Sequence, residues 1–221
     1  MQACSNLPVT AAPVAAFDVR LYRDEPARAG VEAYIARRYA RCHGAHVDAF
    51  PPYLLAAERA GGCTAALGLR PAGPAPLFLE QYLDAPIETT VAAGLRQPVE
   101  RAQVVEIGSL AATSRRGGHL LITLLIEALR GAGFRWLVFT ATRPVRALLQ
   151  ELGFPLHALA TADPARLGAA RATWGRYYEA EPQVMAGDLT VGAARVRADA
   201  QLLALTHAHA AALARLTQAL R

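Results

Sequence analysis

Three observations predict a mixed α/β (α+β) fold. Just over half of the 221 residues are apolar, 53%, which is enough to build a sizeable core. Segments with the two-residue period of strands are interleaved with segments of helical period. Residues 102–142 follow one another as strand, helix and strand, the pattern of a βαβ unit whose strands run parallel. The length suits one large domain or two small ones.

The first half of the chain predicts a small set of strands and two helices. The pair Gly61-Gly62 between two apolar stretches marks a hairpin, and Gly44 marks the end of a helix. The expected elements are a strand at 17–23, a helix at 27–42, two strands within 53–71, a short strand or extended segment at 77–80 and a helix at 87–95.

The second half contains the βαβ unit and a helical end. Glu106 and Gly108 interrupt an otherwise apolar strand, which predicts a bulge or a close approach to a ligand. The expected elements are a strand at 102–113, a helix at 114–131, a strand at 135–142, a helix at 144–153, strands or extended segments at 157–162 and 175–189 with a loop near 164–172, and a C-terminal helix. We expect this last helix, within residues 190–221, to pack on the domain or on a partner subunit as a homodimer contact.

Charge and cysteine content narrow the class of protein. The net charge of +5 comes entirely from scattered arginines, and a nucleic-acid surface usually needs clustered charge. Cys4, Cys42 and Cys63 form no CxxC pair, which favours a reducing compartment and no metal site. The first residues lack the pattern of a signal peptide, and no apolar run approaches the ~20 residues of a membrane span. We therefore expect a cytoplasmic protein with no nucleic-acid partner and no membrane contact.

The start of the helix at 114–131 combines features of an anion site. Backbone N–H groups, the positive helix end and two guanidinium groups converge there, an arrangement that binds phosphates well. The alternative is that Ser114 caps the helix, the glycines permit a tight turn and the arginines are solvated. The stretch matches neither a P-loop nor a G-x-G-x-x-G fingerprint. The candidate residues are Ser114, Arg115, Arg116, Gly117, Gly118 and His119.

Strand, Arg-x-x-Gly-x, long helix and strand resemble the acyl-CoA-binding core of the Gcn5-related N-acetyltransferases. Arg115 and Gly118 match the first and fourth positions of that family's Gln/Arg-x-x-Gly-x-Gly/Ala motif, and Leu120 stands where Gly or Ala is usual. In that family the motif wraps the donor's pyrophosphate, and the splayed preceding strand holds its pantetheine arm. The resemblance implies that residues 114–119 bind the phosphates of an acyl-CoA.

Four blocks resemble the thermostable hemolysin family in the same order, over residues 17–190: LFLEQYLDAPIE, VVEIGSLAA, WLVFTAT and GRYYEAEPQVMAGDL. That family is similar in fold to the acetyltransferases and to acyl-homoserine-lactone synthases. The resemblance implies a mixed, mostly antiparallel sheet with a central splayed parallel pair and flanking helices. Residues 1–189 would form this acyltransferase-like domain, and residues 190–221 a C-terminal helical extension.

Glu106 is the candidate catalytic base, because burial in an apolar strand raises a carboxylate's pKa toward the operating range. The alternative is a carboxylate paired with an arginine in the core. In the homoserine-lactone synthases a glutamate on the corresponding strand is similarly placed near the attacking amine, with Ser-Arg two residues later. Here Gly108 and Ser109 follow without an arginine, which implies a different amine acceptor.

Other candidates lie near the ends of the strands. Glu80 and Tyr82 form an acidic and aromatic edge for a cationic acceptor, or else a solvated strand end. Thr140 and Arg143 close the second strand of the βαβ unit, where Arg143 would clamp a carboxylate or remain an exposed arginine. Tyr177 offers a phenol to protonate a leaving thiolate, as a tyrosine often does in the acetyltransferases, or else packs in the core.

The leading hypothesis is an N-acyltransferase that moves an acyl group from acyl-CoA or acyl carrier protein to a small amine. Glu106 would remove the amine proton, and backbone N–H groups around Leu110 and Ala111 would polarise the thioester carbonyl. No permanently bound cofactor and no metal are expected. Two alternatives remain open: a membrane-active, hemolysin-like protein and a non-catalytic ligand-binding protein of the same fold.

Overall fold

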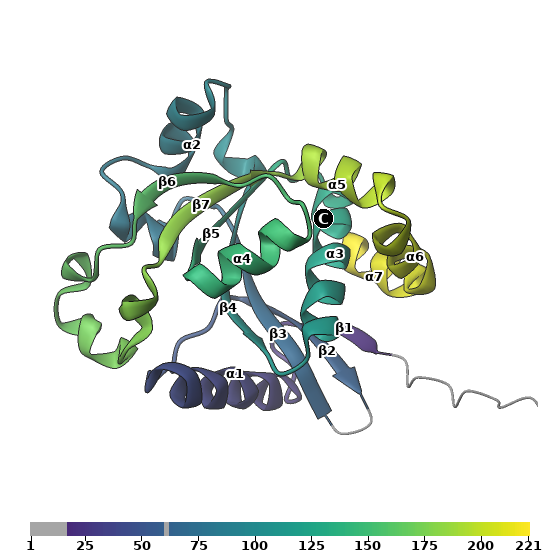
Figure 1. Cartoon of the computed structure of the whole chain (residues 1–221), viewed down its shortest axis with the longest axis horizontal. Helices are drawn as coiled ribbons and strands as arrows, with labels where there is room; N and C mark the ends of the chain where they lie inside the picture. The colour runs from purple at the N-terminus through teal and green to yellow at the C-terminus, as the bar shows by residue number, and fades with distance from the viewer. Residues whose placement is uncertain (1–16, 60–61) are drawn as a thin grey trace, which may run out of the picture.

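The computed structural model describes residues 17–59 and 62–221. Within them, seven strands form one sheet in the order β1-β2-β3-β4-β5-β7-β6 (Figure 1). Neighbouring strands are antiparallel except for β4 and β5, which run parallel. The strands are β1 (Asp18–Tyr22), β2 (Tyr53–Arg59), β3 (Gly62–Pro71), β4 (Val104–Ala112), β5 (Trp136–Ala141), β6 (His157–Thr161) and β7 (Gln183–Asp188). The predicted fold class is confirmed.

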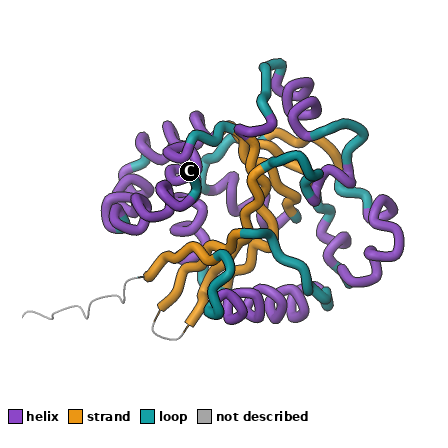
Figure 2. Tube along the Cα trace, turned by 180° about the vertical axis from the view of Figure 1, so that it is seen from behind, coloured by secondary structure: helices purple, strands orange, loops and turns teal. Residues whose placement is uncertain are grey.

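Helices cover both faces of this sheet (Figures 1 and 2). Leu55 and Ala57 of β2 pack into a core with α3, whereas Leu54 and Ala56 pack with α1, because alternate side chains of a strand face opposite sides. One face carries α3 (Arg115–Ala132), α4 (Arg143–Glu151), α5 (Leu189–Ala198), α6 (Ala200–Ala208) and α7 (Ala210–Ala219). The other carries α1 (Arg28–His43), α2 (Ile87–Leu95) and the 3₁₀ helices η1 (Phe78–Tyr82), η3 (Pro164–Trp174) and η4 (Tyr177–Ala180).

The parallel strands β4 and β5 separate part of the way along. They pair from Val104 opposite Trp136 to Ile107 opposite Phe139, and β4 then continues to Ala112 without β5. On its other side β4 pairs with β3, where Ser109 and Leu110 together oppose one residue of β3. Ser109 adopts a φ of 55°, typical of a bulge. The bulge predicted beside Gly108 is confirmed, and it lies where the two strands part.

Several local predictions differ from the structure. The segment predicted as extended at 77–80 is the 3₁₀ helix η1, because its N–H groups turn toward the carboxylates of Glu80 and Glu106. The predicted loop at 164–172 is the 3₁₀ helix η3. Cys4, the N-terminal segment assessed for a signal peptide and most of the Gly61-Gly62 turn lie outside the described residues.

The C-terminal segment is three short helices instead of one. Asp199 is extended, and its carboxylate accepts N–H donations from Gln201 and Leu202, so it caps α6 and interrupts the helical run. Val196, Leu202 and Leu216 from the three helices belong to the same buried cluster as α3. In the described part of the chain, no helix is both long enough and apolar enough to cross a membrane.

Candidate active site

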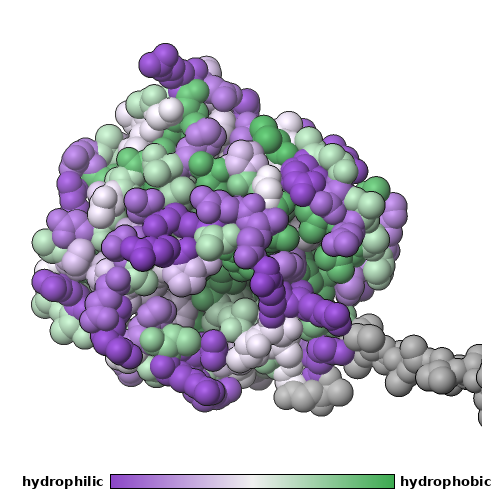
Figure 3. All heavy atoms as spheres, in the orientation of Figure 1, coloured by the Kyte–Doolittle hydropathy of each residue, from purple (hydrophilic) through white to green (hydrophobic). Residues whose placement is uncertain are grey.

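A cavity of about 310 Å³ lies where β4 and β5 part, on the face of the sheet that carries α1. Its floor includes Glu106, Gly108 and Thr140, and its walls come from the loop at 46–51 and from η1, η3 and η4. In Figure 3 apolar side chains, drawn green, are recessed between hydrophilic ones near the centre of the molecule. Six aromatic side chains line this cavity: Tyr39, Phe50, Phe78, Tyr82, Trp174 and Tyr177.

Glu106 is buried on the floor of the cavity, with 6% of its surface exposed. Its Oε1 accepts the N–H of Leu79 at 2.8 Å and its Oε2 accepts the N–H of Phe78 at 3.0 Å. Burial raises the pKa of Glu106, and these two N–H donors and the nearby charge of Arg70 offset part of the rise. The carboxylate makes no ion pair within residues 17–59 and 62–221, so the alternative of a core Glu–Arg pair is not seen. A buried carboxylate of raised pKa in a cavity is suited to taking a proton.

A second, narrow apolar channel lies on the opposite face of the sheet, between α3 and α4. Ile107, Gly108, Ser109 and Thr140 line both this channel and the cavity, so the two spaces lie on either side of the opening between β4 and β5. Leu110, Ile122 and Ile126 are among its other walls. Further apolar space follows beside Phe154 and Leu189. Thr140 therefore borders both spaces, and Glu106 borders the cavity beside it.

Three of the predicted substrate and catalytic residues, Thr140, Tyr82 and Tyr177, line the cavity that contains Glu106. The Thr140 Oγ1 is buried without a hydrogen-bond partner in the described part of the chain, at the junction of cavity and channel. The Tyr177 hydroxyl donates weakly to the Thr140 carbonyl at 3.5 Å, and burial raises the pKa of Tyr177 well above its ordinary value. The Tyr82 and Tyr178 hydroxyls lie 2.5 Å apart.

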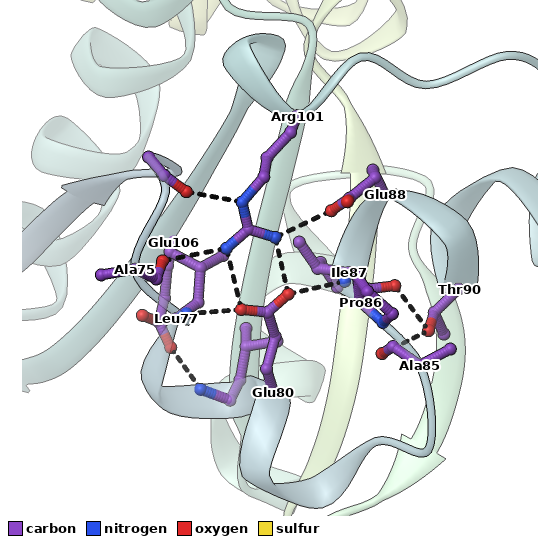
Figure 4. Close-up of polar contacts among 12 residues, drawn as sticks. Ala75, Leu77, Glu80, Ala85, Pro86, Ile87, Glu88, Thr90, Arg101 and Glu106 are labelled. Atoms are coloured by element: carbon purple, nitrogen blue, oxygen red, sulfur yellow. Dashed lines mark hydrogen bonds and ion pairs between the residues drawn. The ribbon is translucent and has the colours of Figure 1, made fainter.

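Glu80 lies outside the cavity lining, and its carboxylate is fully engaged (Figure 4). It accepts the N–H groups of Leu77 and Ile87 and two hydrogen bonds from the Arg101 guanidinium at 2.7 and 2.9 Å. These donors lower the pKa of Glu80 to about 2, although burial opposes them. Glu80 therefore stabilises the turn that contains η1 and does not face the cavity in which an acceptor would bind.

Arg143 also lies away from the cavity. It is exposed at the start of α4 and forms an ion pair with Glu181 at 2.6 Å. Its placement matches the exposed-arginine alternative, since the helix start directs the side chain to solvent. The structure thus brings Glu106, Thr140, Tyr82 and Tyr177 together and leaves Glu80 and Arg143 outside.

The start of α3 is closely packed. The Ser114 Oγ accepts the N–H of Gly117 at 3.2 Å and so caps the helix. A Cβ on Gly117 would lie 3.0 Å from the Thr64 Oγ1, and one on Gly118 would lie 3.7 Å from the Ala112 Cβ. Gly117 therefore allows the helix to approach the sheet closely, whereas at Gly118 a Cβ would make only an ordinary contact. The Ser114 cap matches the capping alternative. The exposed Arg115 pairs with Glu151.

Three other residues predicted to contact the thioester donor differ in how deeply they are buried. Arg116 is exposed on the first turn of α3. His119 is one turn further on, at the spacing that places it on the same face as Ile122 and Ile126 of the channel. Its Nε2 is buried without a partner among the described residues, and burial lowers its pKa. Ala111 is buried and pairs with Ala66 of β3.

Arg70 is a cavity residue that the sequence did not single out. It ends up beside Glu106 because the register of β3 and β4 places the two residues directly opposite each other. The loop at 46–51 is the second unpredicted contributor, since Pro51 packs on Gly68 and Gly108 of the sheet. No local sequence pattern marks either feature. No group of three or more His, Cys, Asp or Glu side chains suited to a metal occurs within 17–59 and 62–221.

A mostly antiparallel sheet that opens between two central parallel strands defines a fold like that of the Gcn5-related N-acetyltransferases. The chain belongs to the thermostable hemolysin family, whose sequence model matches residues 21–193. The resemblance seen in the sequence blocks is confirmed. No curated protein matches the chain.

Solved structures share this fold at low sequence identity. FeeM, an N-acyl amino acid synthase from uncultured soil microbes, aligns with a TM-score of 0.58 and 12% identity over 80% of this chain and 93% of its own. TofI in an apo form aligns with a TM-score of 0.54 and 16% identity, over 85% of this chain and 95% of its own. MesI, a CoA-dependent acyl-homoserine lactone synthase, aligns with a TM-score of 0.51 and 17% identity, over 81% of this chain and 93% of its own. At these identities the likeness establishes the fold.

Proposed function

We propose that this protein is an N-acyltransferase that moves an acyl group from a thioester donor, acyl-CoA or acyl carrier protein, to a small amine. The observation that carries the proposal is that an apolar channel and a polar-floored cavity lie on either side of the opening of the sheet, with the buried Glu106 on the floor of the cavity. Enzymes that join two substrates must hold the reacting atoms at one point. The opening provides that point.

In the proposed reaction, the thioester lies in the channel and the amine in the cavity. The amine nitrogen attacks the thioester carbon, the carbon–sulfur bond breaks, one proton passes from nitrogen to Glu106 and one proton ends on the released thiol. Tyr177, in the same cavity, is the proposed donor of the thiol proton. Backbone N–H groups around Leu110 and Ala111, beyond the last β4–β5 pair, are the proposed donors to the carbonyl oxygen.

The similar structures support this reaction class by the activities in their names. MesI is a CoA-dependent acyl-homoserine lactone synthase, and FeeM is an N-acyl amino acid synthase. The apolar residues of the channel favour a fatty acyl chain over an acetyl group, because buried apolar surface gains about 0.8 kcal/mol for each methylene group.

The direct test is thiol release by the purified full chain. A panel of acyl-CoA donors from acetyl to long-chain is offered with a panel of amines, and thiol release and the N-acyl product are measured by absorbance and mass spectrometry. The proposal expects amine-dependent thiol release that increases with chain length. If no donor and amine pair releases thiol, the non-catalytic alternative holds. If the protein alone also lyses erythrocytes or vesicles, the membrane-active alternative holds.

The proposed donor-phosphate contact is tested by a double substitution, Arg115→Ala with Arg116→Ala. We expect the KM for acyl-CoA to rise roughly 10- to 100-fold with kcat little changed, because charge-assisted contacts to phosphate are lost. Surface charges of this kind contribute little to stability, so Tm should stay the same. The effect should shrink in high salt.

The matched control is Arg215→Ala with Arg221→Ala, which removes two exposed charges from the C-terminal region. It should leave the KM for the donor unchanged. An unaltered donor KM in the Arg115 and Arg116 variant would place the phosphates elsewhere on the molecule.

A further inference from the structure

We propose that the amine acceptor is an α-amino acid with an apolar or aromatic side chain, held by its carboxylate on Arg70 and presented by its amine to Glu106. This inference rests on the proposed function and names the acceptor class for the same site. Nothing in the local sequence around Arg70 suggests it. The juxtaposition of Arg70 and Glu106 across the sheet carries it.

Arg70 and Glu106 are directly opposite each other on antiparallel strands β3 and β4. Side chains in such positions leave the same face of the sheet with Cβ atoms about 5 Å apart. Both line the cavity, and the charge of Arg70 is close enough to lower the pKa of Glu106. A cation and an anion side by side on a cavity floor match the two charged groups of an α-amino acid, which are separated by a single carbon.

The guanidinium of Arg70 is available for a ligand. Arg70 is partly buried, yet it makes no hydrogen bond or ion pair with any residue within 17–59 and 62–221. By contrast Arg101, also partly buried, makes hydrogen bonds to two carboxylates and two carbonyl groups. Arginine binds a carboxylate through two parallel hydrogen bonds, so an unpaired arginine in a cavity is suited to that group.

The charge balance of the cavity also requires a cation for an anionic acceptor. A carboxylate brought beside the buried Glu106 meets a like charge in surroundings of low polarity, which is unfavourable. Arg70 offsets that repulsion. An amine without a carboxylate would instead leave the partly buried Arg70 unpaired when it displaces water. The floor therefore favours acceptors that carry both groups.

The aromatic walls define the rest of the acceptor. The ring centroids of Phe78 and Trp174 are 5.7 Å apart and those of Trp174 and Tyr177 are 5.1 Å apart, so the rings form a continuous surface. Phe78 is 42% exposed, unusual for a large apolar side chain in this protein. An apolar side chain of the acceptor that covers this exposed aromatic surface would gain binding free energy, because both surfaces leave water.

Backbone hydrogen bonds hold this wall in place. The His46 N–H donates to the Thr173 carbonyl and the Arg176 N–H donates to the His43 carbonyl, both at 2.7 Å. They join the end of α1 and the loop after it to the last turn of η3 and to the residue before η4. The cavity walls are therefore connected to each other, and an acceptor enters a largely preformed site.

The test compares L-phenylalanine with phenethylamine, which lacks only the carboxylate, using the best donor of the acyl-CoA panel. For the wild type, kcat/KM for L-phenylalanine should exceed that for phenethylamine at least about tenfold. Arg70→Ala should lower kcat/KM for L-phenylalanine roughly 10- to 100-fold and leave that for phenethylamine nearly unchanged. Arg70→Lys should recover part of the loss, because it restores the charge without the two-pronged geometry.

Arg215→Ala is the control, since it removes an exposed arginine on α7, across the sheet, and should leave both acceptors unaffected. Equal use of the two acceptors by the wild type, or an equal loss with both in Arg70→Ala, would overturn the inference. If no amine supports thiol release, the proposed function fails, and calorimetry then tests the inference alone. L-phenylalanine that binds the wild type and not Arg70→Ala supports the assignment, and no binding to the wild type overturns it.

Discussion

Replacing Glu106 by glutamine is expected to lower kcat for acyl transfer about 10²- to 10⁴-fold, the usual contribution of a positioned general base. The amide keeps the size of the side chain and cannot take the amine proton. The donor KM should change little, because the donor is proposed to lie on the other face of the sheet. Steady-state kinetics with the preferred donor and acceptor measure the effect.

The pH profile separates a base from a merely structural carboxylate. Burial raises the pKa of Glu106 above its ordinary value of 4.5, so the wild-type kcat should increase as the pH rises through that raised pKa and the base ionises. The charges that act on Glu106 are those of Arg70, which lowers its pKa, and Glu80, which raises it. Glu106→Gln should lose this acidic limb. If Glu106→Gln keeps both the wild-type kcat and the acidic limb of the pH profile, Glu106 is not the general base.

Two controls accompany this variant. Glu100→Gln removes an exposed carboxylate outside the cavity and should leave kcat unchanged. The Tm of Glu106→Gln reports its folding, because the new amide group faces the N–H of Phe78 or of Leu79 in place of an oxygen. The loss of kcat is attributed to the base only if the variant has a wild-type circular dichroism spectrum.

Removing the Glu80 side chain is expected to produce the largest loss of stability among the variants considered. Glu80→Ala should lower the free energy of unfolding by about 3 kcal/mol at pH 7, judged from the depression of its pKa to about 2. The substitution leaves the N–H groups of Leu77 and Ile87 and part of the Arg101 guanidinium without their acceptor. Urea unfolding followed by circular dichroism measures the loss.

The same carboxylate gives this loss a definite pH dependence. Because the folded pKa of Glu80 is about 2, below its ordinary value of 4.5, its stabilisation is present above 4.5 and disappears as the pH falls toward 2. The difference between wild type and Glu80→Ala should therefore shrink near pH 3. Glu106 has the opposite sign, since its raised pKa gives stability at low pH that is lost as the pH rises. A difference for Glu80→Ala that is constant between pH 7 and pH 3 would contradict the assigned pKa.

Glu80 also affects the site from outside it. Its contacts fix η1, and η1 supplies the Phe78 and Leu79 N–H groups that hold Glu106. Glu80, which lies within the first family block, was expected either to contact the acceptor or to lie at a solvated strand end. Instead its carboxylate binds Arg101, because the pairing of β3 with β4 brings Arg101 to the same turn.

Local periodicity by itself determined much of this fold. The helix predicted at 87–95 is α2 with the same bounds, and the βαβ unit of β4, α3 and β5 follows from the alternation of apolar runs and glycine stops. The presence of Glu106 and Gly108 in an apolar strand also predicted both a buried carboxylate and a bulge. Such features depend on neighbours along the chain, which the sequence contains directly.

Tertiary structure alone decided which groups meet at the opening of the sheet. Arg70 faces Glu106 through strand register, and the channel exists because β5 leaves β4 after Phe139. Gly117 of α3 packs closely against Thr64 of the sheet. A shift of one residue in register would send Arg70 to the other face of the sheet. Pairing between strands distant in sequence is set by the packing of the whole core, so these contacts leave no local pattern in the chain.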